Sequence, residues 1–214
     1  MTVGAWTFTM IDLAGFTALT EAHGDEYAAD LAVDFADLAR TALAPGDRFI
    51  KSIGDAVLLA SPDPTAGIYL TQRVLERCAT KDHYLLTRTA LHHGPAAGRG
   101  NDFFGAAINL TARLAAHAGA GQTLATDTVA GAARALGVPV EDLGETTFKN
   151  LSEPIGVHAL HLGAPSPVST VDPICRMRIE HQQAAGYLRH HGHEYWFCSL
   201  KCAAQFAREA ADQP

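Results

Sequence analysis

The stretch that decides the fold runs from Trp6 to Thr17 and reads WTFTMIDLAGFT. Its first half is apolar and β-prone, which predicts a strand over Trp6–Ile11, and Asp12-Leu13-Ala14-Gly15 then predicts a tight loop. Apolar residues recur at roughly helical spacing from there to Leu43, with an interruption at His23-Gly24-Asp25. One or two helices are therefore expected after the loop.

The next segments extend this beginning into a defined order. Short strands are expected at residues 48–53 and 56–60, and they flank Gly54-Asp55, a dipeptide typical of a two-residue hairpin turn. A helical pattern follows from Ser61–Pro64 to about Cys78, and a strand is expected at Tyr84–His92. Strand, helix, two hairpinned strands, helix and strand in this order predict a ferredoxin-like α+β sandwich, which is the fold class that we expect.

The rest of the chain divides into additions to this sandwich, a linker and a tail. We expect a Gly-rich loop at Gly94–Asn101, helices at Gly105–His117 and after Asp127, and late strands at Gln122–Ala125 and Val157–Leu162. Residues 163–171, GAPSPVSTV, have the Pro/Ser composition of a linker. The expected units are therefore a domain at 1–162, a linker at 163–171 and a second, small domain at 172–214.

The composition is that of a globular protein. Of 214 residues, 48% are hydrophobic and 18% are charged; the formal net charge of −7 lies wholly in residues 1–171, with 11 basic and 18 acidic side chains. A nucleic-acid partner is disfavoured, because neutralising phosphates requires a basic face. No apolar run has the length of a membrane span and residues 1–6 lack the features of a signal peptide, so we expect no membrane partner and a cytoplasmic location.

Two carboxylates stand at the ends of expected strands. Asp12 closes the first strand, and Asp55 occupies the tip of the hairpin. Carboxylates that converge from strand ends can hold hard cations such as Mg²⁺. The alternative is that each is simply a turn or cap residue.

Five segments, in order over about 150 residues, resemble the motifs of class III nucleotide cyclase catalytic domains. They are FTMIDLAGFTALT (8–20), IKSIGDAVL (50–58), TRTALHHGP (87–95), DFFGAAINLTAR (102–113) and TFKNLSEPIGVHAL (147–160). The resemblance implies a class III cyclase fold and an adenylate cyclase that converts ATP into 3′,5′-cyclic AMP and pyrophosphate.

The same resemblance implies a site with two Mg²⁺ or Mn²⁺ ions. Asp12 and Asp55 would be their ligands, together with the backbone carbonyl of Leu13. The turn at Gly15, Phe16 and Thr17, which opens a helix, would offer backbone N–H groups to the β- and γ-phosphates. A bound 3′-hydroxyl would then attack the α-phosphorus in line, so no side-chain nucleophile is needed.

Further residues acquire roles from the resemblance. Asn109 and Arg113, four positions apart on one expected helix face, would orient the ribose and stabilise the transition state; without the motif they read as an exposed polar stripe. Lys51 and Asp102 match the pair that selects adenine, since a Lys donor and an Asp acceptor complement its N1 and N6. Lys149 would contact the triphosphate, although Asn150 stands where the family commonly has Gly.

The resemblance also implies an assembly. In this family the metal-binding carboxylates and the Lys/Asp/Asn/Arg set of one site come from different subunits. A chain that carries both halves is then expected to form a head-to-tail homodimer with two equivalent sites, and its monomer is expected to be inactive.

Three of the four cysteines fall in the tail, and Cys78 stands alone on an expected helix as a core residue. DPICRM (172–177) and HGHEYWFCSLKC (191–202) resemble the small YHS module, which is related to TRASH-type metal-binding domains. The resemblance implies a soft-metal site of Cys175, His190, Cys198 and Cys202, with His191 or His193 as substitutes for His190 and with zinc before copper. The alternative is that these thiols are buried in a small aromatic core.

Competing functions are thus an adenylate cyclase whose tail senses a metal, a nucleotide-binding regulator with little turnover, and a metal-handling protein that uses the first domain as a dimerising scaffold. Guanylate or pyrimidine cyclase activity is a minor alternative.

Overall fold

The computed structural model describes residues 3–149, 153–163 and 169–211. Within these residues the large sheet consists of strands β1 Val3–Leu13, β2 Arg48–Ile53, β3 Ala56–Ser61, β4 Thr87–Arg99, β5 Asp102–Phe104, β6 Thr123–Thr126, β7 Val140–Thr146 and β8 Ile155–Leu160. The helices around it are α1 Phe16–His23, α2 Asp25–Thr41, α3 Pro64–Ala79, α4 Ala106–His117 and α5 Asp127–Ala135.

The strand order of the sheet is β2-β3-β1-β4-β6-β8-β7, and β5 pairs with β4 outside this path. The neighbours β2/β3, β3/β1 and β1/β4 are all antiparallel. This arrangement, with a helical segment after β1 and another after β3, is the ferredoxin-like sandwich expected from the sequence. This pairing therefore brings the C-terminal end of β1 and the turn of the β2–β3 hairpin to the same end of the sheet.

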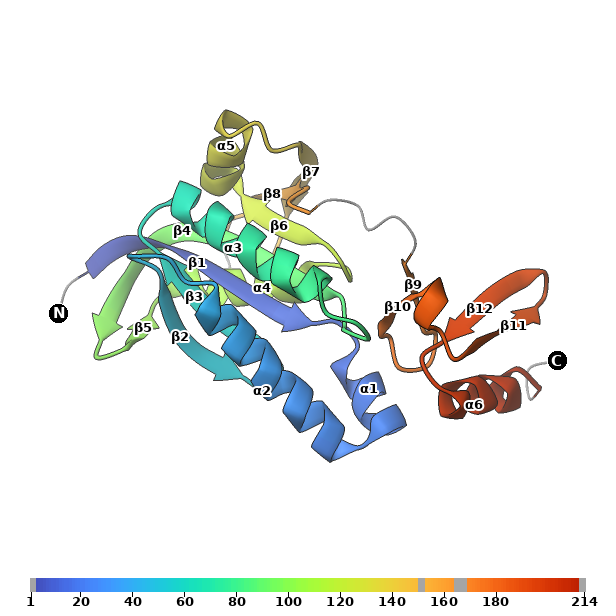
Figure 1. Ribbon diagram of the computed structural model, residues 1–214. Coiled ribbons are helices and arrows are strands. Elements are labelled where there is room, and N and C mark those ends of the chain that lie inside the picture. Colours follow the sequence, from blue (N-terminus) through green and yellow to red (C-terminus); the bar gives the residue numbers. More distant parts are fainter. Residues whose placement is uncertain (1–2, 150–152, 164–168, 212–214) are drawn as a thin grey trace.

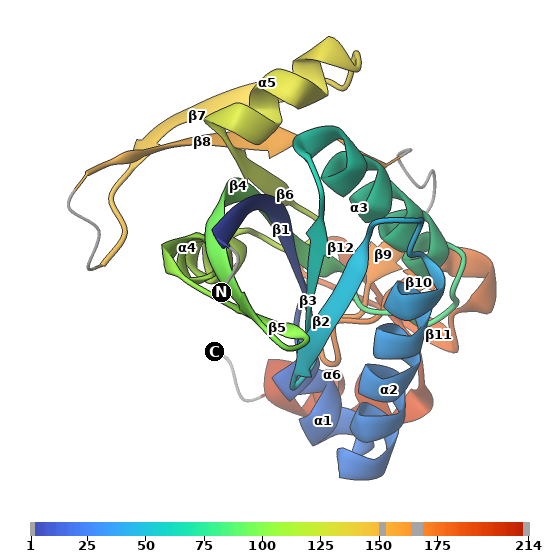
Figure 2. The same ribbon diagram turned by 90° about the vertical axis from the view of Figure 1, so that its left-hand side faces the viewer.

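Helices cover both faces of the sheet, with α4 on one side and α2 and α3 on the other (Figure 2). Alternating residues of β1 supply the two cores, as the strand period of two requires. Phe8 and Met10 pack in the cluster that contains the buried residues of α4, whereas Ile11 and Leu13 pack with α2 and α3. The apolar run of β1 is thus buried on both faces, which fixes its register.

The expected Gly-rich loop at Gly94–Asn101 is wrong, because β4 continues as a strand to Arg99. The pairing partner of this segment is β1, whose register with β4 extends to Val3↔Ala97. Gly94 is a packing residue: a Cβ there would lie 2.9 Å from Nε2 of His92 and 3.2 Å from Cβ of Ala107. The strand β7 was not expected either, and its residues are mostly exposed at the sheet's edge.

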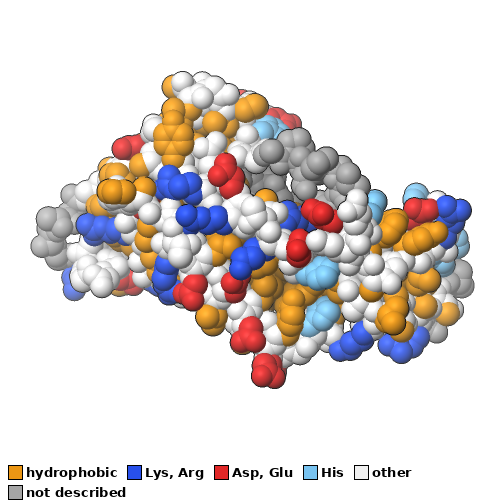
Figure 3. Space-filling view, in the orientation of Figure 1, with side chains coloured by type: hydrophobic (Ala, Val, Ile, Leu, Met, Phe, Trp, Pro, Cys, Tyr) orange, Lys and Arg blue, Asp and Glu red, His pale blue; other side chains and the backbone are white. Residues whose placement is uncertain are grey.

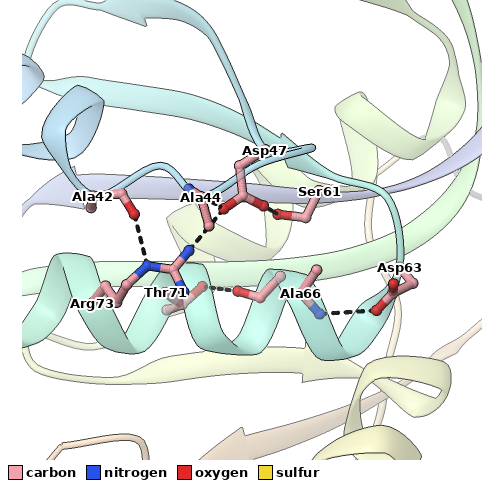
Figure 4. A network of polar contacts seen from close by, with 9 residues as sticks. Ala42, Ala44, Asp47, Ser61, Asp63, Ala66, Thr71 and Arg73 are labelled. Atoms are coloured by element: carbon pink, nitrogen blue, oxygen red, sulfur yellow. Dashed lines mark hydrogen bonds and ion pairs between the residues drawn. The ribbon is translucent and has the colours of Figure 1, made fainter.

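A polar network fixes the connection between α2 and β2 (Figure 4). The Asp47 carboxylate, with a side chain only 2% exposed, accepts hydrogen bonds from Ala44 N–H, Ser61 Oγ and the Arg73 guanidinium at 2.9, 2.7 and 2.8 Å. Arg73 Nε also donates to the carbonyl of Ala42 at 2.7 Å. Helix α3 is thereby tied to the turn that precedes β2.

The tail consists of two short hairpins, a helical turn and one helix. Its elements are β9 Ser169–Val171, β10 Arg178–Glu180, η1 His181–Gln183, β11 Gly186–His190, β12 His193–Phe197 and α6 Leu200–Ala211. Because β9 pairs with β10, residues 169–171 belong to the tail's structure rather than to the linker predicted at 163–171.

The tail packs against the end of the first domain near α1 (Figure 1). Buried tail residues such as Cys175, Met177 and Phe197 share one hydrophobic cluster with Leu19 of α1 and Phe35 of α2. Hydrophobic and histidine side chains reach the surface where the two parts meet (Figure 3). The first domain and the tail therefore share a common hydrophobic core.

The Arg178 guanidinium strengthens this junction. It donates to the carbonyls of Cys78, Ala79 and Lys81 at the end of α3, at 3.3, 2.7 and 2.8 Å.

Among the helices described, none is long and apolar enough to cross a membrane.

Candidate functional site

Asp12 and Asp55 lie together at one end of the sheet. Asp12 is paired across the strands with Ala56 of β3 and with Arg88 of β4, and Asp55 directly precedes Ala56. Gly54 takes φ 62 at the tip of the two-residue turn, so the hairpin closes as its sequence predicted. The two half-buried carboxylates, 43 residues apart in the chain, thus share one environment.

This environment disfavours the simultaneous ionisation of the Asp12 and Asp55 carboxyl groups. Burial and the charge of Asp55 raise the pKa of Asp12 to about 6, although Arg88 opposes the shift. Burial also raises the pKa of Asp55. Two crowded carboxylates with raised pKa values fit a divalent cation, because a cation would remove both the repulsion and the desolvation penalty.

Arg88 was not singled out from the sequence. Its Nε is buried and has no hydrogen-bond partner among the residues described. Only the cross-strand register with Asp12 places it in the site; its position within TRTALHHGP carries no such signal.

The turn after β1 leads directly into α1. Gly15 is the N-cap residue, in the left-handed region at φ 92 and ψ 16, and Ala14 N–H donates to the Leu86 carbonyl at 2.7 Å. Phe16 and Thr17 form the first turn of the helix, where backbone N–H groups lack partners within the helix. The positive end of α1 therefore lies close to Asp12 in the chain, in a turn that could bind an anion.

Lys51 and Asp102 are in direct contact. The Lys51 ammonium lies 2.8 Å from Asp102 Oδ2, and the hydrogen bond lowers the pKa of Asp102. β2 carries Lys51 and β5 carries Asp102, so this pair depends on the β4–β5 hairpin. The Phe104 ring, 53% exposed, lies 5.8 Å from Lys51 Nζ.

Asn109 and Arg113 project from the outer side of α4, whose Leu110 and Leu114 are buried. Asn109 is exposed and Arg113 partly so, and within the described ranges no hydrogen bond or ion pair involves either side chain or links it to Asp12 or Asp55. Lys149 is exposed too and follows the buried Phe148, whereas Asn150 lies outside the described residues. One chain thus does not connect these three residues to the carboxylates.

Solved structures with the same architecture include adenylate cyclases of Trypanosoma brucei, with a TM-score of 0.67, 21% identity and coverage of 74% of this chain and 90% of theirs. The guanylyl cyclase Cya2 matches with a TM-score of 0.61, 18% identity and coverage of 77% and 96%. The fold is that of a nucleotide cyclase catalytic domain. Because adenylate and guanylyl cyclases share it, this fold does not select the base.

Sequence relatives support the same domain, although no family model matches the chain. It is 37% identical over 123 residues to a pH-sensitive adenylate cyclase of Mycobacterium tuberculosis, covering 58% of this chain and 31% of that protein. It is 31% identical over 119 residues to an adenylate cyclase of Glutamicibacter nicotianae, covering 55% and 29%. The match therefore spans less than a third of these relatives.

A second constellation lies where the tail meets the cyclase domain. His23 of α1, Cys175, Cys198 and Cys202 place one ligand atom each within 4.8 Å of one another. Cys175 donating to Cys198 lowers the pKa of Cys198, and burial lowers the pKa of His23. The three thiols expected from the sequence are thus brought together. Cys78, whose pKa burial raises to about 12, lies apart as the expected core residue.

The histidine in this cluster is not the expected one. His190 pairs with His193 at the turn of the β11–β12 hairpin, and its ring contacts His191 and Phe206. Cys198 follows Phe197 at the opposite end of the hairpin, and at about 3.3 Å per residue the two ends lie about 13 Å apart. The histidine that lies beside the three thiols is therefore His23, which no local pattern marked, and not His190, His191 or His193.

Proposed function

We propose that the cyclase domain is an adenylate cyclase that converts ATP into 3′,5′-cyclic AMP and pyrophosphate. The observation that carries this proposal is the convergence of Asp12 and Asp55 beside the Gly15 turn. The named adenylate cyclases among the sequence relatives support the same activity. In the reaction the ribose O3′ forms a bond to the α-phosphorus, the bond from that phosphorus to the bridging oxygen breaks, and pyrophosphate leaves.

Asp12, Asp55 and the Leu13 carbonyl would hold two Mg²⁺ or Mn²⁺ ions. Such ions neutralise the triphosphate and lower the pKa of the attacking hydroxyl when they are bound. The raised pKa values of both carboxylates fit this role, because the pair is poorly accommodated without a cation.

The chain's own residues then position the substrate. The N–H groups of Gly15, Phe16 and Thr17 would receive the β- and γ-phosphates. The Lys51–Asp102 pair, already in contact, would recognise adenine through one donor and one acceptor. Lys149 would contact the triphosphate, and the Arg113 guanidinium would stabilise negative charge as the bond to pyrophosphate breaks.

The assembly proposed for this reaction is a head-to-tail homodimer with two equivalent sites. On α4, Asn109 is exposed and Arg113 is partly exposed, and no described contact connects either side chain to the carboxylates within one chain. Two large apolar side chains, Ile53 beside the Asp55 turn and Phe104 beside Asp102, are 51% and 53% exposed. A second copy would cover these side chains and complete each site.

The activity is tested with the full chain, ATP and Mn²⁺, by measuring cyclic AMP, with GTP, CTP and UTP offered in competition. Asp55→Asn is expected to lower the rate at least about 100-fold, since electrostatic groups at reacting phosphates have effects of this size. Asp30→Asn, an exposed site on α2, is the matched control and should leave the rate unchanged.

A confirmed dimer that forms no cyclic AMP would contradict the proposal. Calorimetry that shows tight ATP binding without product would instead support a nucleotide-binding regulator.

Metal handling is a second candidate function, favoured by the Cys/His cluster. If it is the main function, replacing Cys198 and Cys202 by Ser should abolish the cellular phenotype while Asp55→Ala leaves it intact. The opposite result would exclude this candidate.

A further inference from the structure

The four groups of the Cys/His cluster have the spacing of a tetrahedral site. Cys198 Sγ lies 3.4 Å from Cys175 Sγ and 3.7 Å from Cys202 Sγ, and His23 Nε2 lies 3.6 and 3.9 Å from the sulfurs of Cys198 and Cys202. Zinc–sulfur bonds of about 2.3 Å and zinc–nitrogen bonds of about 2.0–2.1 Å give tetrahedron edges of about 3.8 and 3.6 Å. These four distances are close to the edges of such a tetrahedron, and all four ligand atoms lie within 4.8 Å of one another.

The backbone that carries the thiols is held by a buried carboxylate. Asp172 is fully buried; its Oδ1 accepts from the N–H groups of Ile174 and Cys175 at 2.8 and 3.3 Å, and its Oδ2 accepts from the N–H of Cys198 at 2.8 Å. Ser199 Oγ accepts from the N–H of Cys202 at 3.2 Å. These contacts position all three sulfurs from two separate segments of the tail, as supporting groups around metal ligands do.

The imidazole comes from the other part of the molecule. His23 is the last residue of α1, the eight-residue helix whose N-cap is Gly15. Lys201 of the tail donates to the carbonyl of Ala22, next to His23. The tail therefore also contacts the end of α1 directly beside the cluster.

A second contact reaches the other end of the same helix. Arg176, next to Cys175, has a left-handed backbone at φ 66, and its Cβ and Cγ lie 2.5 and 2.7 Å from where a Cβ on Gly15 would be. A non-glycine residue in this region is strained, so the surrounding structure imposes its position. The loop that supplies one thiol therefore also covers the turn proposed to bind the triphosphate.

We propose that the chain binds one soft divalent cation, with zinc as the prototype, through His23 of the cyclase domain and Cys175, Cys198 and Cys202 of the tail. The ion clamps the tail onto α1. Its occupancy therefore sets how firmly Arg176 is held over Gly15. The connection to substrate binding rests on the proposed cyclase function, whereas the existence of the site does not.

The site is tested by titrating the reduced full chain with zinc alone and, for the ligand set, with Co²⁺. Wild type should bind one equivalent, with the absorption of a tetrahedral ion bound by thiolates. His23→Gln should weaken zinc binding at least about tenfold and change the Co²⁺ spectrum, because it removes one nitrogen ligand. His190→Gln is the matched control and should bind zinc as wild type does.

Hydrogen exchange tests the clamp separately from catalysis. Zinc should slow amide exchange in residues 16–23 of the wild type and of His190→Gln but not of His23→Gln, while circular dichroism checks that each variant is folded. A loss of zinc with His190→Gln and not with His23→Gln would overturn the proposal. So would a chain that binds no zinc and instead forms a Cys175–Cys198 disulfide.

Discussion

Gly15 is a residue of the first domain that the tail covers closely. Its φ of 92 favours glycine, and the methylenes of Arg176 occupy the space where a side chain would lie. Both constraints act against any other residue here. The two constraints can be tested separately, because the positive φ is a property of the Gly15 backbone and the steric contact comes from Arg176 of the tail.

Gly15→Ala is expected to lower the free energy of unfolding by about 2–3 kcal/mol, the sum of about 1 kcal/mol for the left-handed backbone and the cost of the clash. Urea unfolding measures the change. Gly137→Ala is the control, since φ is 75 there and no atom lies within 4 Å of an added Cβ; it should cost only about 1 kcal/mol.

Adding Arg176→Gly to Gly15→Ala should restore free energy of unfolding. The expected gain is the difference between the losses caused by Gly15→Ala and by Gly137→Ala. Equal losses at Gly15 and Gly137 would show that Arg176 does not cover the turn.

His92 is expected to make stability depend on pH. Burial and the neighbouring His93 lower its pKa from 6.5 to about 4, and its Nδ1 is 2.8 Å from Thr126 Oγ1. Between pH 6.5 and 4 the unfolded chain binds the proton and the folded chain does not, so this contribution is complete above pH 6.5 and is lost as the pH falls to 4. The loss amounts to at most about 3 kcal/mol.

Urea unfolding of wild type and His92→Gln from pH 4 to pH 7 measures this contribution as a difference between two curves. The variant should lose less stability on acidification. Parallel curves would exclude His92 as the source.

At the scale of elements, the Asp47 network decides where β2 begins. Asp47 is buried and bound by three donors from the turn, β3 and α3. Removing the carboxylate leaves the Arg73 guanidinium partly buried without its partner. The turn before β2, and with it Lys51 in β2, depends on this one side chain.

Asp47→Ala is expected to destabilise the fold by about 3 kcal/mol, as the breaking of a buried charge pair does. Asp63→Ala is the matched control: Asp63 caps α3 through a 2.9 Å bond from Ala66 N–H, and its loss should cost about 1 kcal/mol. Urea unfolding at neutral pH distinguishes the two. Similar losses would mean that the Asp47 network adds nothing beyond a helix cap.

At the scale of the whole molecule, the proposed dimer predicts complementation. Asp55→Asn and Arg113→Ala should each be inactive as homodimers, because both sites of each dimer lack one group. A heterodimer of the two variants has one intact site when each site draws these residues from different chains. Random mixing should then restore about a quarter of the wild-type rate.

The measurement is cyclic AMP formation after the two variants are mixed under conditions that exchange subunits. No recovery, with heterodimers confirmed by mass spectrometry, would contradict a shared site. The shared site would also be contradicted if the rate of the mixture were no higher than the residual activities of the two variants account for.

The local sequence predicted much of the cyclase domain correctly. The β1–Gly15–α1 connection and the Gly54-Asp55 turn follow from apolar alternation and from glycines that accept positive φ, and these are properties of neighbouring residues. Short-range patterns therefore predicted the strand end and the hairpin turn that carry Asp12 and Asp55. They did not show that β4 runs through Gly94, because a strand that glycines interrupt is defined by its partner β1.

Only the tertiary structure decided which distant groups meet. Arg88 reaches Asp12 through the β1–β4 register, and His23 meets Cys198 across 175 positions of sequence. A local pattern favoured His190 because it is near the thiols in the chain, but the hairpin holds it at the far end. Proximity in space depends on how packed elements are arranged, so the sequence by its own pattern placed three thiols in the tail, and the fold placed His23 beside them.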